Sequence, residues 1–146
     1  MMQDSVHILL VEDDEVDAMA VKRALHEYRV ANPIVVAKDG IEALEHLRGE
    51  NGKAVLPRPN LVLLDINMPR MNGLEFLEAL REDAYLSDTI VFVLTTSNQE
   101  EDVTAAYRKN IAGYMTKKDA GRDFLSLIRM LSEYWRIVIF PPGTPR

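Results

Sequence analysis

Short apolar runs alternate with amphipathic stretches five times along the chain. The runs are nearly continuous in aliphatic residues, a pattern typical of strands that are buried on both faces of a sheet. Between them, hydrophobic residues recur every three or four positions, as they do along one face of a helix. The pattern predicts strands at 6–11, 33–37, 61–64, 89–94 and 111–115, each followed by a helix.

Polar residues mark the expected helix starts. Their side chains accept hydrogen bonds from the free backbone amides of a first helical turn. Asn72 is followed three positions later by Glu75, which is the spacing of a capping box. The caps expected for the five helices are Asp14, Asp39, Asn72, Ser97 or Asn98, and Asp119.

Buried strands separated by helices form a parallel sheet with helices on both faces. Right-handed crossovers then predict an α/β fold with a five-stranded parallel sheet doubly wound with five helices. A chain of 146 residues has the length of one domain. We expect this domain to span 1–136, with a C-terminal extended arm over 137–146.

Candidate site residues follow the expected strands directly. In doubly wound sheets the site lies beyond the carboxyl ends of the strands. Taken singly, these residues have ordinary explanations, as acids near a helix cap, a strand-favouring threonine or a solvated lysine. Their convergence on one sheet edge favours a functional site instead. The residues are Glu12, Asp13, Asp65, Thr95 and Lys117.

This set suits Mg²⁺-dependent phosphoryl transfer to a carboxylate. Mg²⁺ takes oxygen ligands in octahedral geometry and retains several waters. Asp13 and Asp65 are the expected direct ligands, Glu12 would act through a water, and Asn67 would add its backbone carbonyl. Asp65 is also the expected nucleophile, because a carboxylate oxygen can hold a phosphoryl group as an acyl phosphate.

The remaining candidates would stabilise the transferred group. Lys117 would neutralise phosphoryl oxygens and the hydroxyl of Thr95 would donate a hydrogen bond to one of them. Tyr114 is a candidate aromatic that changes rotamer when Thr95 is recruited, although packing at the sheet edge also explains a tyrosine there.

The composition narrows the range of possible binding partners. The net charge of −6 argues against nucleic acid and anionic membrane surfaces, which both attract clustered positive charge. The chain has no cysteine, which fits a cytoplasmic location. We see no signal peptide and no apolar run near the roughly 20 residues of a membrane span.

Four motifs together resemble the response-regulator receiver domain of two-component signalling. They lie at 8–14, 64–75, 93–96 and 113–117, and the resemblance covers about 6–131. It implies a flavodoxin-like receiver fold with Asp65 as the phosphoacceptor. It also implies that Glu12 and Asp13 are the acid pair, Thr95 and Tyr114 the switch pair, and Lys117 the active-site lysine. Two departures are Glu12, where aspartate is commoner, and Lys118, where the family usually has proline.

The resemblance implies a single-domain response regulator rather than a conventional enzyme. A phosphohistidine of a partner histidine kinase would donate the group with Mg²⁺, and the receiver would catalyse the transfer and its own slow dephosphorylation. The acyl phosphate would then switch a binding surface or pass onward in a phosphorelay. The long loop 49–59 and the tryptophan-containing tail resemble regulators that are paired with phytochrome-type kinases, so a bacteriophytochrome is a candidate partner.

The segment after the last helix is apolar and favours an extended conformation. An exposed apolar strand usually finds a partner, so we expect a homodimer through a C-terminal arm. The alternative is a tail that packs against its own domain. The expected arm residues are Trp135, Ile137, Val138, Ile139 and Phe140.

Two other functions remain open. A Mg²⁺-dependent phosphohydrolase also uses an aspartyl phosphate, but it favours a second carboxylate two residues after the nucleophile, where this chain has Asn67. A phosphate-independent pseudo-receiver would carry out no phosphoryl transfer. The presence of the complete set of site residues argues against it, namely Asp13, Asp65, Thr95 and Lys117.

Overall fold

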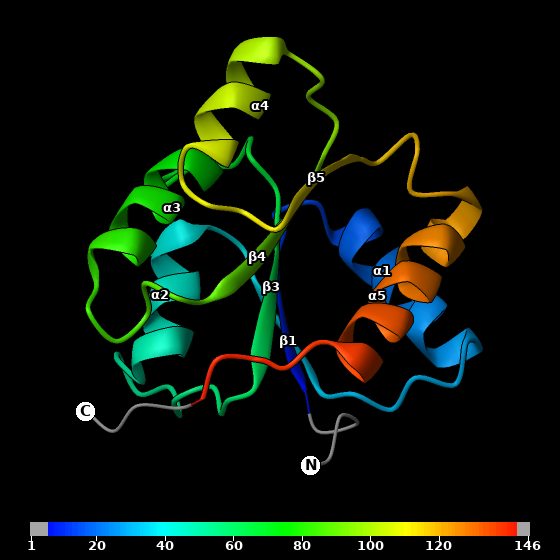
Figure 1. The fold of residues 1–146 in the computed structure, drawn as a ribbon, viewed down its shortest axis with the longest axis horizontal. Helices are drawn as coiled ribbons and strands as arrows, with labels where there is room; N and C mark the ends of the chain where they lie inside the picture. The colour runs from blue at the N-terminus through cyan, green and yellow to red at the C-terminus, as the bar shows by residue number, and fades with distance from the viewer. Residues whose placement is uncertain (1–5, 143–146) are drawn as a thin grey trace.

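The computed structural model describes residues 6–142 of the chain. Within that range, parallel strands form one five-stranded sheet in the order β2-β1-β3-β4-β5 (Figure 1). The chain builds outward from β1 to one edge, then crosses back and builds the other side, which is the predicted doubly wound topology. The strands are β1 His7–Val11, β2 Ile34–Ala37, β3 Asn60–Leu64, β4 Ile90–Thr95 and β5 Gly113–Thr116.

Helices cover both faces of this sheet. One layer contains α1 and α5, and the other contains α2, α3 and α4 (Figure 1). Within residues 6–142, no helix combines the length and apolar character needed to cross a membrane. The helices are α1 Glu15–Glu27, α2 Gly40–Arg48, α3 Gly73–Glu82, α4 Glu100–Tyr107 and α5 Leu125–Ile137, with a short 3-10 helix η2 at Arg122–Phe124.

The central strands supply side chains to both layers. Successive residues of a strand point to opposite faces of the sheet. In β3, Leu61 and Leu63 pack into the core under α1 and α5, whereas Val62 and Leu64 pack into the core under α2 and α3. The strands are therefore continuously apolar because both of their faces are buried, as the sequence pattern predicted.

Three helices begin at the predicted caps. Asp14, Asp39 and Asn72 each accept a hydrogen bond from the amide three residues later, at 3.2, 2.9 and 2.9 Å. Glu75 returns a hydrogen bond to the amide of Asn72 and completes the capping box. These polar side chains set the phase of their helices and so decide which faces meet the sheet.

The start of α4 differs from the prediction. Its N-cap is Gln99, which makes no side-chain capping bond. Neither Ser97 nor Asn98 caps the helix. The hydroxyl of Ser97 instead donates a hydrogen bond to the side chain of Asp102, inside the first turn.

The start of α5 also differs, because Asp119 does not cap it. The amide of Asp119 donates to the hydroxyl of Thr116, and that hydroxyl donates back to the carboxylate of Asp119 at 2.9 Å. The pair closes a turn after β5, and η2 intervenes before α5 begins. The nearby threonine hydroxyl satisfies the carboxylate that was expected to cap the helix.

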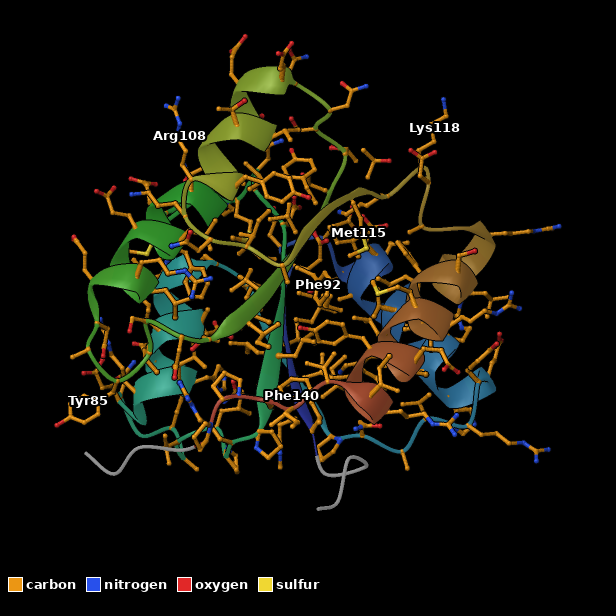
Figure 2. All side chains as sticks on the ribbon, in the orientation of Figure 1. Tyr85, Phe92, Arg108, Met115, Lys118 and Phe140 are labelled. Carbon is orange, nitrogen blue, oxygen red and sulfur yellow. The ribbon has the colours of Figure 1, made fainter. Side chains whose placement is uncertain are left out.

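The segment after α5 packs against its own domain and runs back across the lower end of the sheet in Figure 1. Trp135 is 3% exposed and Phe140 is 8% exposed. The ring of Phe140 meets Tyr134 edge-on at a centroid distance of 5.9 Å, and Tyr134 meets Phe92 of β4 at 5.0 Å. Phe92 and Phe140 both lie inside the molecule in Figure 2. These contacts make the segment part of the core.

This burial corrects the prediction that Trp135 and Phe140 belong to a dimer arm. Contacts within the chain remove both rings from solvent, so a second molecule has no access to them. The expected arm also starts too early, since Ile137 still belongs to α5. Ile137 and Ile139 are 78% and 92% exposed, while Val138 is half-buried. Residues 143–146 of the expected arm lie outside the described residues.

Replacing Phe140 with alanine tests this packing. Phe140→Ala is expected to lower the free energy of unfolding by about 2–4 kcal/mol, because it leaves a cavity beside Tyr134. The matched control Ile139→Ala removes an exposed side chain and should change stability by less than about 0.5 kcal/mol. Urea unfolding, followed by the fluorescence of Trp135, measures both. Equal losses in the two variants would contradict the packed tail.

Candidate functional site

The candidate site is built on the sheet ladder itself, which continues one residue beyond the strands. The amide of Asp65 donates to the last carbonyl of β1 at 3.0 Å, and the amide of Glu12 donates to the last carbonyl of β2 at 2.9 Å. The amide of Lys117 donates to the carbonyl of Thr95 at 2.8 Å. Backbone hydrogen bonds thus hold the predicted residues at one edge of the sheet.

Three carboxylates gather at this edge. Glu12, Asp13 and Asp65 each offer an oxygen, and the three oxygens lie within 4.8 Å of one another. Glu12 and Asp65 are buried, whereas Asp13 is exposed. An all-oxygen donor set with one open side suits a hard divalent cation that keeps part of its water shell. The residues present therefore fit the metal site that the sequence predicted.

The backbone after Asp65 turns sharply into α3. The amide of Asn67 donates to Asp65 Oδ1 at 3.3 Å, and the amide of Gly73 donates to the carbonyl of Ile66 at 2.9 Å. A Cβ at Gly73 would lie 2.5 Å from the carbonyl oxygen of Asp65, so only glycine fits there without a shift. The loop stays close to the phosphoacceptor candidate, and the metal role of the Asn67 carbonyl remains a prediction.

An ion pair anchors the same loop from the side. Arg70 donates to both carboxylate oxygens of Asp39, at 2.7 and 3.2 Å. Burial alone would raise the pKa of Asp39, but the hydrogen bonds from Arg70 and from the amide of Glu42 lower it below its usual value. Arg70 has a φ of 60°, an unfavourable backbone conformation for an arginine. The bidentate contact ties the loop to the start of α2.

Lys117 lies among three carboxylates. Its Nζ is 2.7 Å from Glu12 Oε1, 2.7 Å from Asp17 Oδ2 and 3.5 Å from Asp65 Oδ2. Burial disfavours the charged ammonium, but the hydrogen bonds and charges of these acids outweigh burial and raise the pKa of Lys117. The side chain is therefore a permanent cation at the centre of the acid cluster.

For Glu12, the effect of burial on the pKa outweighs the effect of its hydrogen bond. Burial raises the pKa of Glu12 to about 7 and the negative charge of Asp65 adds to the rise, while the hydrogen bond and charge of Lys117 oppose both. A buried carboxylate beside other acids gives up its proton reluctantly. A divalent cation would relieve this repulsion, so a proton and a cation compete for the cluster.

Thr95 and Tyr114 connect the site to the loop before α4. The buried hydroxyl of Thr95 donates to Asp65 Oδ1 at 2.7 Å and accepts a bond from the amide of Ser97 at 3.4 Å. The hydroxyl of Tyr114 donates to the carbonyl of Ser97 at 2.9 Å. Burial raises the pKa of Tyr114, which keeps the phenol protonated as a donor. A continuous set of hydrogen bonds thus runs from Asp65 to α4.

The structure brings the sequence-predicted residues together and adds others that the sequence did not reveal. Asp17, Arg70 and Ser97 were not assigned to the site. The local signal for Asp17 was its place in the first turn of the helix that follows Glu12 and Asp13. The contacts of Arg70 and Ser97 depend on loop conformation and had no such signal.

The residue after the lysine adopts an ordinary peptide geometry. Among residues 6–142, the cis peptide bond joins Arg58 and Pro59, so the Lys117–Lys118 bond is trans. Lys118 points away from the body of the molecule (Figure 2). Its replacement of a usual proline therefore leaves the Lys117 ammonium within reach of the acids.

Sequence comparison identifies a family over most of the chain. The model of the response regulator receiver domain matches residues 8–129. The response regulator Rcp1 of Synechocystis is 34% identical over 136 residues, an alignment that covers 93% of this chain and 92% of that protein.

Solved structures agree in fold over nearly the same range. The Mn²⁺-bound form of Rcp1 has a TM-score of 0.82 at 33% identity, covering 94% of this chain and 99% of that one. The phosphorylated cyanobacterial phytochrome response regulator RcpA has a TM-score of 0.84 at 32% identity, with the same coverage. The acid cluster, the hydroxyl and the ammonium at the sheet edge thus occur in a chain that belongs to the response-regulator receiver domain family of two-component signalling.

Proposed function

We propose that Asp65 is the phosphoacceptor and that a partner histidine kinase donates the group in the presence of Mg²⁺. The observation that carries this proposal is the surroundings of one carboxylate. Asp65 is buried, lies among the oxygens of Glu12 and Asp13, accepts a hydrogen bond from Thr95 and faces the ammonium of Lys117. Each neighbour supplies a charge or a donor that phosphoryl transfer needs.

In the proposed transfer, an oxygen of Asp65 attacks the phosphorus of the kinase phosphohistidine. The P–N bond breaks, the imidazole keeps the electron pair, and an acyl phosphate forms on the protein. Glu12, Asp13 and Asp65 would hold Mg²⁺, which would supply positive charge to the phosphoryl transfer. Lys117 would neutralise a further oxygen from its position 3.5 Å from Asp65. The chain would thereby catalyse its own phosphorylation and, with water as acceptor, its slow dephosphorylation.

The proposed output is a change in the loop before α4. The Thr95 hydroxyl now donates to Asp65 Oδ1, and a phosphoryl group on Asp65 would offer it a more highly charged acceptor. The Ser97 amide contacts the same hydroxyl and the Ser97 carbonyl holds Tyr114. A movement of Thr95 would therefore alter the contacts of both the loop and β5. In this proposal, phosphorylation changes the relative populations of two arrangements of this region.

The pathway is also part of the proposal. The relative RcpA is described as a phytochrome response regulator. The similarity to RcpA supports a phytochrome-type kinase as the partner of this chain. We also propose a cytoplasmic location and a role as a switch or phosphorelay intermediate. A phosphohydrolase is less well supported, because Asn67 stands where such enzymes favour a second carboxylate. A pseudo-receiver is disfavoured by the close contacts among Asp65, Thr95 and Lys117.

A homodimer is proposed on a smaller surface than the sequence suggested. Ile137 and Ile139 are two large, strongly exposed aliphatic side chains near the end of the chain, and their exposure favours an apolar partner surface. A second copy of the chain presents the same two residues, so the contact would be self-complementary.

Intact mass after incubation with Mg²⁺ and a small acyl-phosphate donor tests the phosphoacceptor. Wild type should gain one phosphoryl group and should fail to do so with excess chelator. Asp65→Asn should gain none, because the amide is not a nucleophile of this kind. Asp88→Asn removes an exposed acid of the loop before β4 and should react as wild type does. An adduct on Asp65→Asn, or none on wild type, would contradict the assignment.

Removal of one hydroxyl tests the route to α4. Tyr114→Phe cannot donate to the Ser97 carbonyl, so phosphorylation should change hydrogen exchange over 97–107 less than it does in wild type. The amount of acyl phosphate formed should stay within about twofold, since Tyr114 does not touch Asp65. Tyr107→Phe, an exposed tyrosine of α4, is the control. An unaltered exchange response in Tyr114→Phe would rule out this route.

A double substitution tests the dimer. Ile137→Asp together with Ile139→Asp places two charges on the proposed surface and should convert a dimeric wild type to a monomer in sedimentation velocity. Val16→Asp, which changes a similarly exposed residue on α1, should leave the mass unchanged. A monomeric wild type, or a double variant that keeps the dimer mass, would refute the contact.

A further inference from the structure

Asp17 contacts the site lysine from a separate helix. Its Oδ2 lies 2.7 Å from Lys117 Nζ, as close as Glu12 Oε1 and closer than the 3.5 Å of Asp65 Oδ2. Asp17 is nevertheless outside the three-acid cluster of Glu12, Asp13 and Asp65 that fits a cation. It is therefore a carboxylate of the site that neither the metal role nor the phosphoacceptor role uses.

The position of Asp17 is well determined by the turn that starts α1. Asp14 Oδ1 accepts hydrogen bonds from the amides of Val16 and Asp17, at 2.8 and 3.2 Å. The amide of Asp14 in turn donates to Glu12 Oε2 at 3.2 Å. One capped turn thus links Glu12 to Asp17, and each of these residues has a carboxylate oxygen 2.7 Å from the ammonium.

Building on the proposed function, we propose that Asp17 is a positioning residue that holds the Lys117 ammonium when a divalent cation, and then a phosphoryl group, takes over the other carboxylates. Lys117 is then kept beside Asp65 without competing for the acids that a cation needs. The one structural fact behind this role is that Lys117 divides its contacts between a cluster acid and an acid outside the cluster.

A count of charges supports the assignment. Three acids contact one ammonium, and two of them, Glu12 and Asp65, belong to the cluster that fits the cation. A divalent cation repels the ammonium and attracts Glu12 and Asp65, which are two of its three partners. Asp17 is the partner that remains. Without Asp17, Lys117 has only those two contested acids, so the ammonium and the cation compete for them.

The rival explanation is an ordinary ion pair near the surface. The side chain of Asp17 is 31% exposed, and pairs of this kind often contribute little to stability. Such a pair would affect unfolding slightly and cation binding no more than any nearby acid does. The two explanations therefore differ in the effect on cation affinity rather than in the effect on stability.

Calorimetric titration with Mg²⁺ separates them. Asp17→Asn should weaken binding about fivefold to tenfold, because the ammonium then competes with the cation for Glu12 and Asp65. Glu15→Gln removes the same charge from an exposed position in the same helical turn and should weaken binding less than about twofold. Asp17→Glu restores the carboxylate and should recover most of the affinity. Equal effects of Asp17→Asn and Glu15→Gln would overturn the proposal.

An NMR signal of the Lys117 ammonium gives a second readout that general stability does not affect. In Mg²⁺-bound wild type, the Nζ protons should exchange slowly enough to be observed, because Asp17 holds them. The signal should disappear in Asp17→Asn and persist in Glu15→Gln. A persistent signal in folded, Mg²⁺-saturated Asp17→Asn would overturn the assignment.

The outcome is separable from that of the proposed function. If wild type is phosphorylated and binds Mg²⁺ while Asp17→Asn behaves as Glu15→Gln does, the role of Asp17 fails and the receiver chemistry stands. If wild type binds no Mg²⁺, both the proposed cofactor and the role of Asp17 fail.

Discussion

A single half-buried ammonium holds together carboxylates that would otherwise repel one another. Lys117 lies within 3.5 Å of Glu12, Asp17 and Asp65, and these acids come from the ends of β1 and β3 and from α1. Like charges at this spacing in a partly dry site are unfavourable, and the raised pKa of Glu12 reflects its burial and the neighbouring Asp65. The site is thus arranged to receive further positive charge, which a divalent cation supplies.

The topology of the sheet makes this arrangement possible. Parallel strands end at the same edge, so residues far apart in sequence become neighbours without a dedicated binding loop. The ladder hydrogen bonds that extend to Glu12, Asp65 and Lys117 hold each backbone in place, and only the side chains remain to respond. The opposite edge of the sheet contributes to stability, because the buried ring of Phe140 packs against Tyr134 there.

Much of the fold and site followed from the sequence because burial and strand ends leave local signals. The continuous apolar strands, the caps at Asp14, Asp39 and Asn72, and the polar residues after each strand were readable. Contacts that depend on how helices and strands pack together could not be predicted from the sequence. The tail is the clearest case, because the same apolar pattern suits a dimer arm and a buried segment, and only the space beside Tyr134 decides that Phe140 is inside. Asp17 is a second case, because its place in the first turn after the acid pair was readable, whereas its contact with Lys117, a hundred positions away, was not.

The most direct test is to locate the bound cation by NMR. Substoichiometric Mn²⁺ broadens the NMR signals of nearby amides, so the pattern of broadening maps the site on the folded chain. Broadening is expected to centre on 11–14, 65–67 and 117, where three strand ends meet. Broadening centred instead on the acidic start of α4, at Glu100, Glu101 and Asp102, would show that exposed negative charge alone attracts the ion and would contradict a cation site at the strand ends.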